Sequence, residues 1–125
     1  MRIGELARRT GLSRDTIRFY ERNELIASSP SREATNSYRD YPEGLIERLE
    51  MIVTARDAGM SIADLALLFS HLEGGTDADF DADAFIDRRI AELKRSIAQA
   101  RRFLKLLEDT RAAFDKGPVE WRDKD

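Results

Sequence analysis

The residues of this chain best suited to binding chemistry are arginines. Residues 1–41 hold eight Arg against six acidic residues, and every basic residue before Lys94 is Arg. The planar guanidinium group binds phosphate oxygens and guanine edges through two parallel hydrogen bonds. The formal net charge of −3 does not oppose this, because binding to phosphates depends on local contacts and not on the total charge. The arginines therefore favour a nucleic-acid surface in the first third of the chain.

Residue types that carry catalysis or hold metals are scarce. The 125 residues include no Cys and a single His, His71. Soft metals such as copper(I), mercury and cadmium prefer thiolate ligands, and none exists here. Zinc is offered at most His71 with Glu73 or Asp77, which makes a weak site. The sequence predicts a protein that is not an enzyme and that uses no cofactor and no metal.

The start of the chain also bears on its location. Residues 1–10 are amphipathic and lack the apolar core of a signal peptide. No segment approaches the ~18 consecutive apolar residues of a membrane-spanning helix. These features predict a cytoplasmic protein.

An acidic segment lies in the middle of the chain, with Asp at every second position from Asp77 to Asp83. Such spacing suggests calcium, but Ala82 stands where a calcium loop needs Gly, and Arg88 where it needs Glu. Residues 73–85 are therefore interpreted as an acidic linker and helix cap. Its last aspartate, Asp83, is expected to cap the helix that follows.

Two short helices must position the first arginines. Residues 3–9 are amphipathic, Gly11 breaks the pattern, and Ser13 suits the N-cap of a helix over residues 14–23. Leu12 and Ile17 flank that cap as a hydrophobic staple. The pattern fits a helix-turn-helix, and from spacing alone it fits a plain helical hairpin equally well.

The rest of the N-terminal part combines a hairpin with two further helices. Residues 26–28 and 37–41 are expected to pair as short strands. Pro42 suits the first position of a third helix, which Gly59 ends. Ser61 and Asp64 resemble a capping box at the start of a fourth helix. Residues 1–72 are thus expected to form one compact domain.

Residues 86–114 show the most regular periodicity in the chain. Apolar side chains recur at alternating steps of four and three, as in a coiled coil. These positions are expected to form a dimer interface: Ile86, Ile90, Leu93, Ile97, Ala100, Leu104, Leu107 and Phe114. A helix of about 43 Å is too long to pack wholly on a small domain, so a second copy is the simplest partner. Phe103 and Leu106 lie off this seam and are expected to contact the partner's N-terminal domain, while residues 115–125 form a short tail.

The run IGELARRTGLSRDTIRFYERNELI resembles the first two helices of the MerR family of bacterial transcription regulators. NSYRDY resembles the wing of that family, and LIERLEMIVTARDAGMSIADLALLF resembles its third and fourth helices. The resemblance covers residues 1–70 almost without gaps. The long helix matches the family's antiparallel dimerisation helix in position and length.

The resemblance implies a mainly α fold: a winged helix-turn-helix DNA-binding head followed by a long coiled-coil dimerisation helix. It implies a homodimer that binds a pseudo-palindromic promoter operator and distorts the spacer DNA, so that RNA polymerase is affected only through the promoter. By motif position, the implied DNA-binding residues are Ser13, Arg14, Thr16, Arg18, Tyr20, Tyr38, Arg39 and Arg56.

Several residues depart from the family pattern. Ser37 stands where the wing usually has Gly, and Asp15 and Asp40 repel phosphate. Asp15 has a second possible role, as an acceptor for a cytosine amino group. The acidic residues leave open an alternative, a helical protein–protein adapter that has kept the fold but lost specific DNA binding. The effector is unknown: an apolar ligand near Phe103, Phe114 and Trp121 and no ligand at all both fit.

Overall fold

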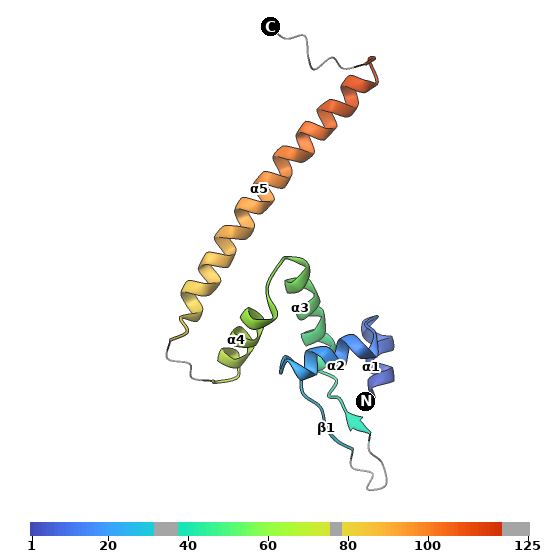
Figure 1. The fold of residues 1–125 in the computed structure, drawn as a ribbon, viewed down its shortest axis with the longest axis vertical. Coiled ribbons are helices and arrows are strands. Elements are labelled where there is room, and N and C mark those ends of the chain that lie inside the picture. Colours follow the sequence, from blue (N-terminus) through green and yellow to red (C-terminus); the bar gives the residue numbers. More distant parts are fainter. Residues whose placement is uncertain (32–37, 76–78, 119–125) are drawn as a thin grey trace. The chain divides into compact units, whose positions relative to one another are not determined.

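The computed structural model describes residues 1–31, 38–75 and 79–118, which form two units (Figure 1). The first, Met1–Phe80, holds a winged helix-turn-helix, and the second begins at Asp81 and holds one long helix. The predicted mainly α fold is confirmed. In chain order the elements are α1 Ile3–Thr10, α2 Arg14–Arg22, β1 Ser29–Pro30, β2 Arg39–Asp40, α3 Leu45–Asp57, α4 Ile62–Leu72 and α5 Ala82–Phe114.

The core of the first unit gathers one apolar face from each of its helices. Its most deeply buried side chains are Leu6, Ile17, Leu25, Leu49, Ile52 and Leu65. Burying a Leu or Ile side chain contributes about 1.5–3 kcal/mol, so the burial of these side chains stabilises the unit substantially. The core fixes α1 and α2 against α3, and it thereby sets the orientation of the arginines on α2.

Arg48 joins the ends of three elements at the edge of this core. Its Nε donates to the Leu25 carbonyl at 2.6 Å, and its guanidinium carbon lies 4.3 Å from the centre of the Phe69 ring. An ion pair with Glu73 completes the contacts. Arg48 on α3 therefore connects the segment after α2 to the end of α4.

The predicted N-caps Ser13 and Ser61 are confirmed, whereas the predicted start of the third helix at Pro42 is wrong. Ser13 Oγ and Ser61 Oγ each accept the backbone N–H three residues on, at 3.0 Å. Pro42, however, does not begin α3. The N–H groups of Leu45 and Ile46 bond to carbonyls only three residues back, so residues 42–44 form a tight turn before the α-helical bonds begin.

The wing is shorter than predicted and begins later. Ser29 pairs with Asp40 and Pro30 with Arg39 in an antiparallel ladder. The expected first strand over residues 26–28 is wrong, because Ile26 is buried in the core and Ser28 is hydrogen-bonded to Glu21. Ser37, at the predicted wing turn, lies outside the described residues.

The long helix begins four residues earlier than predicted. The Asp81 carboxylate accepts the Ala84 N–H at 3.0 Å, so Asp81 is the N-cap in place of Asp83, which lies in the first turn. Ala82 and Ala84 are strong helix formers, which explains why the helix extends back to this cap. The predicted end at Phe114 is correct.

All four helices of the first unit end in the same way, with one residue in the left-handed region, which after α1 is Gly11 at φ of 74°. Gly59 and Gly74 take that position after α3 and α4, at φ of 91° and 85°. After α2 the position is held by Glu24, at φ of 62°. The N–H groups of Glu24 and Leu25 cap the carbonyls of Glu21 and Tyr20 at 3.0 Å, so the turn is closed although its residue is unsuited to it.

Replacing Glu24 with glycine should therefore stabilise the protein. A left-handed conformation costs a non-glycine residue about 1–2 kcal/mol, and the greater freedom of glycine in the unfolded chain offsets part of the gain. We expect Glu24→Gly to raise the free energy of unfolding by about 0.5–1 kcal/mol in urea titrations.

The matched control is Glu50→Gly, which places the same change inside α3. There it should lower stability by about 1 kcal/mol, because glycine is a poor helix former. A loss of stability in both variants would contradict the strain assigned to Glu24.

Candidate nucleic-acid interface

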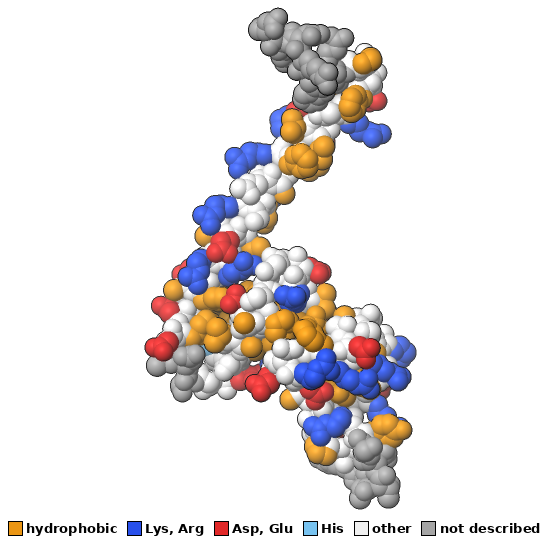
Figure 2. All heavy atoms as spheres, in the orientation of Figure 1, with side chains coloured by type: hydrophobic (Ala, Val, Ile, Leu, Met, Phe, Trp, Pro, Cys, Tyr) orange, Lys and Arg blue, Asp and Glu red, His pale blue; other side chains and the backbone are white. Residues whose placement is uncertain are grey.

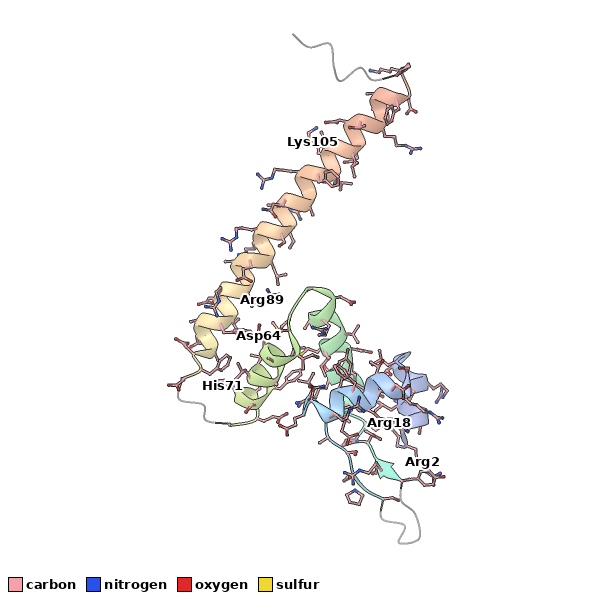
Figure 3. The ribbon with its side chains drawn as sticks, viewed as in Figure 1. Arg2, Arg18, Asp64, His71, Arg89 and Lys105 are labelled. Carbon is pink, nitrogen blue, oxygen red and sulfur yellow. The ribbon has the colours of Figure 1, made fainter. Side chains whose placement is uncertain are left out.

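A groove of about 820 Å³ brings together basic residues from separate parts of the first unit. Its polar lining comes from the start of α1, from α2 and from the wing: Arg2, Arg14, Arg18, Tyr38 and Arg39. Glu5 is the only acidic residue of the described chain that lines it. Figure 2 shows basic side chains, which are all Arg in this part of the sequence, gathered on this unit, and Figure 3 labels Arg2 and Arg18. Four guanidinium groups around one groove suit a polyanion.

Arg14 reaches this groove by crossing the first turn of α1. A Cβ atom added at Gly4 would lie 2.7 Å from Arg14 Nη2, closer than such contacts allow. A side chain at position 4 would therefore displace the Arg14 guanidinium group from this place. The sequence pattern placed Arg14 on α2 but gave no sign of this contact.

Arg2 is a groove residue that the sequence analysis missed. Its guanidinium carbon lies 4.3 Å from the centre of the Tyr38 ring, a cation–π contact between the start of the chain and the wing. The contact follows from backbone pairing, since the Tyr41 N–H donates to the Met1 carbonyl at 2.7 Å. No local pattern predicts a pair 36 residues apart.

The two acidic residues that oppose phosphate have different surroundings. Asp40 is paired, with its carboxylate 2.7 Å from the Met1 amino nitrogen. Asp15 is 97% exposed, and its carboxylate lies 3.6 Å from Arg18 Nη1. That distance is ionic but longer than a hydrogen bond, so Arg18, itself 52% exposed, keeps its donors for a ligand.

A single carboxylate, that of Glu21, attaches the wing to α2. Glu21 accepts hydrogen bonds from the Ser28 hydroxyl and N–H and, at 2.8 Å, from the Tyr41 hydroxyl. Arg39 joins the group by donating to Ser28 Oγ at 2.9 Å and to the Ser28 carbonyl at 3.0 Å. The wing residue Arg39 is thus held in register with α2.

These contacts shift two pKa values in opposite directions. Burial raises the pKa of Glu21, but the hydrogen bonds from Ser28 and Tyr41 and the charge of Arg39 outweigh it, so the net pKa is lowered. Burial raises the pKa of Tyr41, and the hydrogen bond to the Glu21 carboxylate raises it further. Glu21 is therefore ionised and Tyr41 neutral at neutral pH.

The remaining predicted DNA-binding residues are placed differently. At the start of α2, Ser13 is exposed and Thr16 is half-buried, and Ser13 Oγ donates to Thr16 Oγ1 at 2.8 Å. Tyr20 is only 8% exposed, and its ring belongs to the core. Arg56 does not line the groove. It is exposed at the end of α3, where Nη1 donates to the Met60 carbonyl at 2.9 Å.

The predicted dimer seam lies on the surface of α5, where its large side chains are 37–60% exposed. Phe103 and Leu106, off the seam, are equally open at 59% and 55%. Figure 2 shows apolar side chains along this helix. Such a stripe on a 33-residue helix has the pattern that a partner helix covers.

The weak zinc site considered from the sequence has little support. His71 packs edge-on against Phe80, with ring centroids 5.9 Å apart, and Asp77 lies outside the described residues. Within the described ranges, no three His, Asp or Glu side chains gather in a way that would hold a metal. None of the described helices is long and apolar enough to span a membrane.

The lowered pKa of Glu21 predicts how stability depends on pH. A carboxylate with a depressed folded pKa stabilises the fold above its unfolded pKa, near 4.5, and this stabilisation is lost as the pH falls through the folded value. Glu21→Gln should therefore lower the free energy of unfolding most at about pH 7, with the difference from wild type shrinking at about pH 3.

Urea titrations across this pH range measure the difference, and Glu50→Gln, on the exposed surface of α3, controls for loss of one carboxylate. If the difference in free energy of unfolding between wild type and Glu21→Gln stays constant with pH, ionisation of the Glu21 carboxylate does not stabilise the fold.

Comparison with known proteins agrees with this geometry. Residues 1–72 match the family described as MerR HTH family regulatory protein, and residues 46–110 match the one described as MerR, DNA binding. The chain is 33% identical over 108 residues to heavy metal-dependent transcription regulator 2 of Rhizobium meliloti, over 86% of this chain and 72% of that protein. It is 37% identical over 98 residues to the regulator HmrR of Sinorhizobium medicae, over 78% and 65%.

Solved structures share the fold. The crystal structure of HiNmlR, described as a MerR family regulator lacking the sensor domain and bound to promoter DNA, superposes with a TM-score of 0.74. The alignment covers 92% of this chain and 90% of HiNmlR at 23% identity. These matches are to regulators and not to enzymes. The family matches, taken with the helix-turn-helix and its basic groove, show that this chain belongs to the MerR family and is a DNA-binding regulator of transcription.

Proposed function

We propose that this chain works as a homodimer that binds a pseudo-palindromic promoter operator through the basic groove of each protomer. The observation that carries the proposal is the convergence of four guanidinium groups from α1, α2 and the wing on one groove. The likeness in fold to HiNmlR, whose structure is described as bound to promoter DNA, supports it.

In this proposal α2 enters the major groove and Arg18 reads a base or grips a phosphate. Ser13, Arg14 and Thr16 lie at the start of α2, where a recognition helix meets the DNA. Tyr38 and Arg39 contact the backbone or minor groove from the wing, and Arg56 contacts a phosphate from α3. Buried Tyr20 acts by holding α2 on the core.

The exposed seam of α5 supplies the dimer contact in this proposal. Residues 1–72 act as the DNA-binding domain, residues 73–85 as linker and cap, residues 86–114 as the dimerisation helix and residues 115–125 as a tail. A pair of such helices holds two heads at one separation, whereas operator half-sites repeat every ~34–36 Å. If the separation of the two heads differs from that of the half-sites, binding bends or untwists the central base pairs at a cost of about 1–6 kcal/mol. Circular-permutation gel shifts detect such a bend.

We further propose that the chain acts in the cytoplasm and has no catalytic activity. It affects RNA polymerase through the shape of the promoter. The chain has no Cys, so thiolate sensing of soft metals is outside its chemistry.

Arginine substitutions test the DNA contacts. If Arg18 reads a base, Arg18→Ala should weaken binding to an operator selected from a randomised DNA pool by about 1–3 kcal/mol. It should weaken binding to unrelated duplexes less. Arg56→Ala should weaken all duplexes alike and reduce the salt slope by about one unit, because it loses a phosphate contact. Titrations at several salt concentrations separate the two.

Binding that is unchanged in both variants would favour a protein–protein adapter over a DNA-binding regulator. Circular dichroism of each variant confirms that the fold is intact.

A charge in the α5 seam tests the dimer. Leu93→Asp should convert the protein from dimer to monomer at micromolar concentration, because an unpaired carboxylate buried between helices costs several kcal/mol. Sedimentation velocity measures the change, and Gln99→Asp places the same charge on the exposed helix away from the seam as a control. A wild-type chain that sediments as a monomer would refute the dimer.

A further inference from the structure

Asp15 is an acidic residue on the helix that meets DNA. It is the second residue of α2, and the N-terminal residues of a recognition helix contact base edges in the major groove. Its side chain is 97% exposed, which leaves the carboxylate free of the protein core and directed to solvent. A carboxylate there is repelled by phosphates unless a donor on the DNA receives it.

Arg18 stands one helical turn further on and shares a face with Asp15. The two charged groups lie 3.6 Å apart, so they reach DNA at neighbouring points. Arg18 lines the basic groove and keeps its donors free at that distance from the carboxylate. The base edges that the two side chains touch are therefore no further apart than about one base-pair step.

The chemistry of the major groove limits what Asp15 accepts. Only cytosine N4 and adenine N6 donate there. Adenine N7, an acceptor beside N6, repels a carboxylate, whereas cytosine offers an amino group beside an apolar C–H. Arg18 prefers guanine, whose O6 and N7 accept both donors of a guanidinium.

We infer that Asp15 and Arg18 form a specificity pair that reads a cytosine and a guanine within one base-pair step of each operator half-site. The inference rests on the proposed function, since it requires α2 in the major groove. Asp15 repels phosphate and so lowers the affinity for DNA in general, but it favours cytosine at one position and so raises the selectivity for the operator.

Helix stabilisation alone does not account for the residue. A carboxylate in the first turn favours the helix dipole, but Ser13 already caps α2 through the Thr16 N–H. A role in stability alone leaves base preference unchanged when Asp15 is replaced. The test therefore measures base preference and not only stability.

The experiment selects duplexes from a randomised pool with the wild-type protein and then compares binding to single-base variants of the selected site. At one position next to the guanine read by Arg18, wild type should prefer cytosine by about 5-fold to 150-fold. Asp15→Ala should lose that preference and bind non-operator DNA more tightly. Asp15→Asn should shift the preference toward adenine, because an amide pairs with adenine N6 and N7.

The matched control is Glu5→Gln, which removes one negative charge from the groove lining and, like Asp15, pairs with an arginine three residues on. It should tighten binding to all duplexes and leave the base preference intact. Cytosine preference retained in Asp15→Ala would overturn the specificity pair while leaving the regulator standing. A wild-type protein that selects no sequence would overturn both.

Discussion

The Glu21 carboxylate holds α2 and the wing together beside the basic groove. It accepts hydrogen bonds from Ser28 and Tyr41, on either side of the wing, while Arg39 is tied to the same Ser28. A two-residue strand pair has too few backbone hydrogen bonds to position a wing alone. The hydrogen bonds to Glu21 stabilise its negative charge at the edge of the core. The same bonds hold the wing in one position relative to α2.

The basic groove shows how an acidic chain presents a surface for a polyanion. Its arginines come from segments far apart in the sequence, and each is positioned by a specific neighbour. The Arg14 guanidinium group lies over Gly4, Arg2 stacks on Tyr38, and Arg39 is bonded to Ser28. Because counterion release depends on such local contacts, the net charge of −3 does not oppose binding. The acidic residues near the groove are paired within the protein: Asp40 with the Met1 amino group, Glu5 with Arg8 and Asp15 with Arg18.

The second unit presents an apolar surface instead of a basic one. Along α5 the large side chains of the predicted dimer seam are about half exposed. The regular spacing places the apolar side chains on one face of the helix, and that face is exposed in the single chain because no partner covers it. The relatives include a regulator described as heavy metal-dependent, yet this chain has no thiolate.

Local patterns in the sequence were sufficient to predict five helices and the caps Ser13 and Ser61, because a cap and a periodic apolar face depend on residues within one or two turns. The predicted starts of α3 and α5 were wrong. Local patterns were insufficient where the partner is distant. The start of β1, the burial of Ile26 and the contact of Arg2 with Tyr38 follow from packing of segments remote in the chain. Arg18 was identifiable by motif, but the groove around it is decided by the tertiary structure, because only the common core brings α1, α2 and the wing to one place.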